Sequence, residues 1–233
     1  MKPLIDIDDA ATWPRHIYRI VSTWAAECAG KTSYTNDLPL RIELEAPFRE
    51  QLASYLLCAY HYTRLLPHER AMIFDHGLRT LSADLLEQRI EAARTVGAIS
   101  TAEAEYFHKA HVFAAGEQEH REGQVCFVLS ERRYERDPGA CLPLLNSWGG
   151  EGLYRSSYSV PFRARLETLG SPTRVTSLIA LADDKNHSVF PALHKVFVAS
   201  LLGLHDVGAD VYYRASIPPE HVQRIDEVLL LTS

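Results

Sequence analysis

Five residues with useful side-chain chemistry stand together at the end of an apolar run in the first third of the chain. Residues 56–65 have the sequence Leu-Leu-Cys-Ala-Tyr-His-Tyr-Thr-Arg-Leu, which places Tyr60-His61-Tyr62-Thr63-Arg64 in its second half. The run has the length and composition of a buried strand. A buried strand that delivers His, Thr and Arg into the turn before a helix is a common way to build an anion or nucleotide site.

The helix expected after this strand covers residues 67–77. Pro67 is acceptable in a first helical turn, and Glu69 complements the positive end of a helix. Met72 can face inward, and Gly77 can end the helix in a left-handed conformation.

A second unusual stretch is Trp148-Gly149-Gly150-Glu151-Gly152-Leu153-Tyr154. Three glycines around one Glu, flanked by aromatic residues, make a poor sequence for a helix or a regular strand. The stretch suits a close backbone approach to a flat ligand.

Together these residues form a reasonable set for holding a nucleotide sugar. His and Thr side chains can hydrogen-bond ribose hydroxyls, Arg can bind a diphosphate, and aromatic rings can stack on a flat ring. A Glu can stabilise the positive charge that develops on a sugar carbon when a glycosidic bond breaks. The candidate binding residues are His61, Tyr62, Thr63, Arg64, Ser130, Trp148 and Tyr154, and the candidate catalytic residues are Glu151 and His61.

Around these residues the pattern predicts one α+β domain over residues 1–233, with a split, mostly antiparallel sheet and outer helices. Helices are predicted over residues 12–30 and within a helical insert at 80–120. A further helix is predicted to begin at Ser188 or Pro191 and to end at Leu202. Alternation at 38–44 predicts a half-exposed strand. Further strands are predicted at 124–130, 173–181, 209–215 and 225–231.

Composition narrows the class of protein. The net charge of −6 argues against a large nonspecific nucleic-acid surface, while 19 of the 24 basic residues are Arg, which suits compact phosphate recognition. No apolar run approaches the roughly 18–20 residues that a membrane span needs, and the N-terminus lacks a signal-peptide core. We therefore expect a cytoplasmic protein without a membrane partner.

Several other chemistries lack their sequence frames. Lys31 follows no glycine frame of a phosphate loop, no GxSxG elbow is present, and the four cysteines form no CxxC pair. A metal-dependent hydrolase built on His108, His111 and His120 remains an alternative, although no HExxH frame supports it and a solvated helix face is the simpler reading. No metal is expected.

The order of elements resembles the ADP-ribosyltransferase superfamily, in its diphtheria-toxin-like His–Tyr–Glu branch. Residues 60–64 and the ExxxIxxxGL pattern at 69–78 resemble the opening strand–helix unit of that branch, which bacterial toxins and phage-defence effectors share. Residues 211–222, with Pro218-Pro219-Glu220 before the last strand, resemble its closing segment.

This resemblance implies an ADP-ribosyltransferase-like fold and mono-ADP-ribosyl transfer from NAD to a macromolecular acceptor, as in a toxin or defence effector. It implies that His61 binds the nicotinamide-side ribose, that Thr63 and Arg64 line the cleft, and that Glu151 is the catalytic glutamate. Tyr134 and Tyr154 both remain candidates for the stacking tyrosine. An antitoxin or inhibitor protein would be a further partner.

Two other functions stay open at this point. The protein could hydrolyse NAD as a glycohydrolase, or the fold could be a non-catalytic module that binds a nucleotide or a partner chain. The acceptor is also open, because the acidic net charge favours protein whereas the cluster of Arg132, Arg133 and Arg136 favours nucleic acid.

Overall fold

The computed structural model describes residues 2–30, 37–116, 122–132, 142, 144–154, 160–181, 188–204 and 209–229. The chain divides into two compact units that are interleaved in the sequence. Unit 1 comprises residues 1–61, 126–138 and 176–214, and unit 2 comprises residues 62–125, 139–175 and 215–233.

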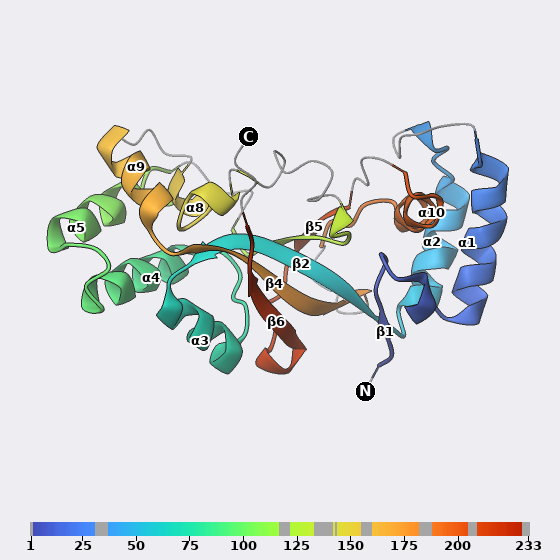
Figure 1. The fold of residues 1–233 in the computed structure, drawn as a ribbon, viewed down its shortest axis with the longest axis horizontal. Helices are drawn as coiled ribbons and strands as arrows, with labels where there is room; N and C mark the ends of the chain where they lie inside the picture. Colours follow the sequence, from blue (N-terminus) through green and yellow to red (C-terminus); the bar gives the residue numbers. More distant parts are fainter. Residues whose placement is uncertain are drawn as a thin grey trace. The chain divides into compact units, whose positions relative to one another are not determined.

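The described strands form one open, mostly antiparallel sheet, which confirms the α+β class (Figure 1). The strand order is β5 (Asp210–Tyr213), β3 (Val125–Val128), β2 (Leu56–Leu65), β4 (Ser171–Ala180) and β6 (Val222–Glu227). Strand β1 (Leu4–Ile5) pairs in parallel with β2, whereas β3 is antiparallel to β2. Strands β2 and β4 are each ten residues long, and each has a strand paired on both of its sides.

Strand β2 is buried along almost its whole length. Nine of its ten residues are buried, and His61 is the one that keeps partial exposure. A strand covered on both faces reads as a continuous apolar run, which is why residues 56–60 predict it correctly.

Three helices lie side by side in unit 1 (Figure 1). They are α1 (Arg15–Cys28), α2 (Ile42–Leu52) and α10 (Leu193–Leu202). Helix α1 buries a residue on each successive turn, at Ile17, Val21, Ala25 and Cys28. This burial explains why the predicted helix over 12–30 is found over most of that range.

Helix α2 shows where local pattern fails. The strand predicted at 38–44 is wrong, because the helix begins at Ile42. Leu40 and Ile42 are 59% and 74% exposed, so the apolar–polar alternation does not mark a buried strand face. The helix instead carries Glu45, whose carboxylate accepts the Leu193 and His194 backbone N–H groups at 3.0 and 3.3 Å and so caps α10.

Unit 2 holds α3 (Pro67–His76), α4 (Ala83–Thr95), α5 (Thr101–Ala110), α8 (Glu151–Tyr154) and α9 (Val160–Thr168) (Figure 1). Helices α4 and α5 lie in the stretch predicted to be a helical insert. Ser82 caps α4, and Ser100 and Glu103 form the predicted capping box of α5. Short 3₁₀ turns at Ala10–Thr12 (η1, unit 1) and Pro219–His221 (η4, unit 2) complete the described elements.

Helix α3 differs from an ordinary amphipathic helix. Its only buried residue is Glu69, whereas Met72, expected to face inward, is 44% exposed.

In the part of the chain that the structure describes, every helix is too short or too polar to cross a membrane.

Gly77 ends α3 in a backbone conformation that the sequence does not predict. Its φ is +80° as expected, but its ψ of −174° lies outside the left-handed helical region. This region is essentially restricted to glycine. A Cβ at this position would lie 1.9 Å from the Ile217 carbonyl oxygen, beside the bridge between Leu78 and Ile217.

Gly77→Ala should therefore destabilise the protein by about 3 kcal/mol or more, from backbone strain and overlap together. Gly97→Ala is the matched control, because Gly97 also has a positive φ (+73°) but open space around its Cβ position. The control should cost about 1–2 kcal/mol. Urea denaturation of both variants measures the difference, and equal losses would contradict the overlap with Ile217.

Candidate functional site

His61 is fixed in one orientation on β2. Its Nδ1 lies 2.8 Å from the Cys126 carbonyl oxygen, and its ring meets the Phe127 ring edge-on with centroids 6.0 Å apart. Because a carbonyl oxygen only accepts hydrogen bonds, Nδ1 carries the proton and Nε2 is the acceptor nitrogen of the neutral ring. The ring belongs to the one residue of β2 that keeps partial exposure.

The next two residues of β2, Tyr62 and Thr63, belong to unit 2 and are buried, with 3% and 6% of their surface exposed. Successive side chains of a strand point to opposite faces, so these two do not lie on the same face. The sequence grouped both with the ribose-binding residues, and the structure places both within a covered strand.

Arg64 is anchored inside unit 2. Its guanidinium donates to three main-chain carbonyls: Leu169 at 2.9 Å, Leu145 at 3.1 Å and Gly170 at 2.8 Å. Burial lowers the pKa of Arg64 from its very high usual value, and a nearby Glu167 opposes this shift. The side chain thus ties β2 to two chain segments, which is a structural task distinct from the diphosphate binding predicted for it.

Glu69 of α3 forms the centre of a buried polar cluster. Its Oε2 accepts the Leu66 backbone N–H at 2.7 Å and the Trp148 indole N–H at 2.9 Å, while Oε1 accepts the Arg89 Nε–H at 2.6 Å. The Arg89 guanidinium also lies over the Trp148 ring, 5.4 Å from its centroid. Both carboxylate oxygens therefore have partners, as a buried charge requires.

The ionisation of Glu69 follows from these contacts. Burial alone would raise the pKa of its carboxyl, but the charge of Arg89 and the hydrogen bonds from Arg89, Leu66 and Trp148 outweigh burial. The pKa of Glu69 therefore lies below its usual value, and the group is charged at neutral pH.

The Trp148–Tyr154 stretch contains a short helix where the sequence predicted none. Helix α8 begins at Glu151 after a turn in which the Gly150 N–H donates to the Ser147 carbonyl at 3.2 Å. Trp148 is fully buried rather than available for stacking on a ligand. The side chains of Glu151 and Tyr154 lie outside the described part of the structure, as do Arg133, Tyr134, Arg136 and His120 entirely.

Ser130 lies in unit 1 and is also engaged within the protein. Its hydroxyl donates to Asp8 Oδ1 at 2.7 Å, and the Glu131 backbone N–H donates to Asp8 Oδ2 at 2.6 Å. Arg132 donates to the carbonyl oxygens of Asp8 and Ser200. This cluster ties the chain after β3 to the N-terminal segment.

The candidate residues thus separate into two groups. In unit 2, Arg64 and Trp148 come together through Arg89, which reaches the Arg64 carbonyl at 3.5 Å while it lies over the Trp148 ring. In unit 1, His61 and Ser130 have the separate partners described above. Sequence reasoning missed Arg89 and the central role of Glu69, although a Glu in the third position of a helix is a recognisable capping signal.

His111, one of the histidines of the alternative metal site, has a structural contact in unit 2. His111 is buried, its Nδ1 accepts the Ala114 N–H at 3.3 Å, and burial lowers its pKa. No group of three or more His, Cys, Asp or Glu side chains with metal-ligand geometry occurs among the described residues.

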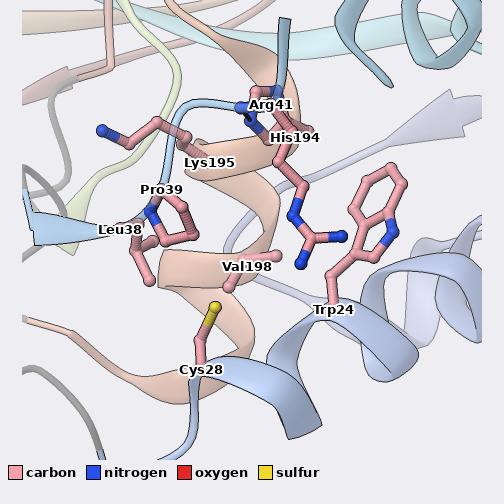
Figure 2. A pocket seen from close by; sticks show the side chains of 8 residues that line it. All are labelled: Trp24, Cys28, Leu38, Pro39, Arg41, His194, Lys195 and Val198. Atoms are coloured by element: carbon pink, nitrogen blue, oxygen red, sulfur yellow. Dashed lines mark hydrogen bonds between the residues drawn. The ribbon is translucent and has the colours of Figure 1, made fainter. Parts of the chain in front are cut away.

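A pocket in unit 1 lies between α1, α10 and the chain before α2 (Figure 2). Its lining residues are Trp24, Cys28, Leu38, Pro39, Arg41, His194, Lys195 and Val198. His194 donates from Nδ1 to Glu45 at 2.6 Å and accepts the Arg41 N–H at Nε2. With a volume of about 20 Å³, the pocket has room for about one water molecule and is too small for a nucleotide.

Comparison of the chain with protein-family models, with curated proteins and with solved structures gives no match in any of the three.

Removing the Glu69 carboxylate should leave the partly buried Arg89 guanidinium without its charge partner and the Trp148 indole N–H without its acceptor. We expect Glu69→Ala to lower the free energy of unfolding by about 3–5 kcal/mol at pH 7. Because the pKa of Glu69 is depressed in the folded state, its contribution is present above the unfolded pKa, near 4.5, and is lost as the pH falls through the folded value. The gap between variant and wild type should shrink below about pH 4.5.

Urea denaturation between pH 3 and pH 7 measures this gap. Glu91→Ala is the control, because Glu91 pairs with Arg94 on the exposed face of α4 and should leave stability near that of wild type. A difference in unfolding free energy between wild type and Glu69→Ala that stays constant with pH would contradict the charged state of Glu69.

Arg64→Lys tests whether the anchoring of β2 depends on the planar guanidinium. A lysine cannot reach three carbonyls in the same fork geometry, so buried acceptors would lose their donors, at a cost of about 2–4 kcal/mol in stability. Arg79→Lys, on an exposed side chain, should change stability little. Thermal unfolding compares the two variants, and equal melting temperatures would show that Arg64 does not hold the fold.

Proposed function

We propose that this protein transfers ADP-ribose from NAD to a macromolecular acceptor, with His61 and Glu151 as the residues that act on NAD. The observation that carries the proposal is the setting of His61. It is the one partly exposed residue of an otherwise buried ten-residue strand, and its ring is locked through Nδ1. A polar side chain that keeps partial exposure on an otherwise buried strand is a candidate for contact with a ligand.

The role proposed for His61 follows from its tautomer. With Nδ1–H donated to the Cys126 carbonyl, Nε2 is an acceptor for a ribose hydroxyl. A ring held in this way needs no reorientation when a ligand binds, so it can fix the nicotinamide-side ribose with little entropic cost.

The role proposed for Glu151 is electrostatic. The bond between the ribose carbon and the nicotinamide nitrogen breaks first, and the nitrogen keeps the electron pair and leaves as neutral nicotinamide. A carboxylate near the ribose carbon stabilises the resulting cation. A nucleophilic atom of the acceptor then bonds to that carbon, and its proton passes to the carboxylate or to water.

Arg64, Ser130 and Trp148 receive supporting roles in this proposal. Each is buried with partners inside the protein, and such partners favour holding the site over contacting NAD. The proposal includes an ADP-ribosyltransferase-like arrangement of the fold, which the α+β class and the open sheet support only at the level of class. Tyr62, Thr63 and Tyr154 remain proposed cleft residues.

The test uses purified protein, NAD labelled in the adenosine part, and cell lysate with or without nuclease treatment. Wild type should label macromolecules, and nuclease sensitivity of the label would identify a nucleic-acid acceptor. Free nicotinamide without labelled product would instead indicate a glycohydrolase. Absence of both, together with no NAD binding in calorimetry, would refute the proposal in favour of a binding module.

Variants assign the roles of the two residues. Glu151→Gln should lower the turnover rate at least about 100-fold while NAD still binds, because only the charge of the transition state loses its stabiliser. His61→Ala should weaken NAD binding by about 3- to 10-fold, the value of one hydrogen bond. His76→Ala and Glu105→Gln, at exposed helix positions, are the controls. Full turnover in Glu151→Gln would remove Glu151 from the mechanism.

A further inference from the structure

We propose that Glu69 is a positioning residue: its buried carboxylate holds the Trp148 indole and thereby fixes the chain segment 148–153, which carries Glu151. The inference rests on the function proposed above for Glu151. Glu69 and Trp148 themselves touch no substrate in this scheme, and they act through the backbone between them and Glu151.

Burial of the Glu69 carboxylate costs free energy. A carboxylate is almost never buried unless it is paired, and α3 buries no other residue. An apolar side chain at this position would fill the space without any charge to compensate. Glu69 is the single buried residue of α3, so the buried position of this helix depends on the hydrogen bonds of a carboxylate and not on apolar packing.

Trp148 is held at two points. Its indole N–H donates to Glu69 Oε2 at 2.9 Å, and its backbone N–H donates to the Leu166 carbonyl at 3.0 Å. The ring is fully buried against a cluster that includes Phe107 and Leu153. The side chain therefore has one orientation, which the carboxylate sets.

The backbone after Trp148 has little conformational freedom. Gly149 has a φ of +83°, and a Cβ there would lie 2.2 Å from a Leu153 methyl carbon. The Gly152 carbonyl accepts the Val112 N–H at 3.1 Å, and Gly152 packs against Leu86. With both flanks of Glu151 fixed, a shift of Trp148 is passed along three residues to Glu151.

The consequence for catalysis is geometric. A displacement of about 1 Å at a reacting group can lower a rate 100-fold even when the mutated residue is remote from the chemistry. Loss of the bond between Trp148 and Glu69 should therefore reduce turnover and leave NAD affinity nearly unchanged. Loss of a ring that stacks directly on NAD would instead raise KM.

The experiment compares Trp148→Phe with Trp13→Phe. Both substitutions remove one indole N–H donor from a buried ring, since the Trp13 indole donates to the Asp6 carbonyl at 2.8 Å in unit 1. Amide hydrogen exchange over residues 149–153 and steady-state nicotinamide release are measured for each variant. Glu69→Gln is a second variant that weakens the hydrogen bond from Trp148, because its single amide oxygen replaces the two carboxylate oxygens that accept from Leu66, Trp148 and Arg89. Thermal unfolding confirms that each variant is folded.

We expect exchange at residues 149–153 to accelerate at least about tenfold in Trp148→Phe and not in Trp13→Phe, with kcat lower by about 10- to 100-fold and KM for NAD within twofold. Unchanged exchange in both Trp148→Phe and Glu69→Gln would overturn the positioning role. Faster exchange with unchanged kcat, or a raised KM with unchanged kcat, would overturn its link to the reaction.

The two proposals fail in different ways. A wild-type protein that releases no nicotinamide refutes the proposed function and with it the catalytic consequence of Glu69. Hydrogen exchange still decides whether Glu69 holds the segment, because that readout needs no substrate.

Discussion

The burial of β2 on both faces is the constraint from which the rest of the described site follows. A strand without solvent on either face cannot leave polar side chains without hydrogen-bond partners. The strand nevertheless carries Arg64 near its end, and it satisfies that side chain with carbonyls from residues 145, 169 and 170. The polar half of β2 therefore includes a side chain, Arg64, whose hydrogen bonds are made within the protein. It holds together chain segments that are up to 106 residues away in sequence.

Two buried charges of unit 2 act on the same stretch of chain. Arg64 binds the carbonyl of Leu145, and Glu69 binds the indole of Trp148 three residues later. Burying either charge costs free energy, and its hydrogen bonds offset this cost only if the partner groups stay in place. Charged groups used in this way favour a single arrangement of residues 145–148 over alternatives with similar apolar packing, because a shifted register would leave a charge without its partners. Rigidity in this stretch therefore depends on polar contacts as well as on the core around Phe107.

The sequence predicts those elements whose signals are local. The continuous apolar run of β2, the Ser82 cap and the capping box of Ser100 and Glu103 each depend on residues within a few positions of each other. The beginning of helix α2 was predicted as part of a strand at 38–44, because the apolar–polar alternation there does not mark a buried face. The turn of helix at Glu151 was not predicted, because glycines disfavour a helix unless distant groups fix them. The same limit applies to the site. A Glu near a helix start is visible in the sequence, but its pairing with Arg89 and Trp148 spans 20 and 79 residues and is set only by the fold.

The cap that Glu45 provides to α10 has a consequence for how the chain is made. The acid and the helix end that it caps are 148 residues apart, and α10 packs against both α1 and α2. At ordinary rates of translation, about 7–30 s pass between the synthesis of these two parts. During that interval the apolar faces of α1 and α2 have been made but the helix that covers them has not. The residues of α1 and α2 that pack against α10 therefore remain without this cover until residues 193–202 have been made.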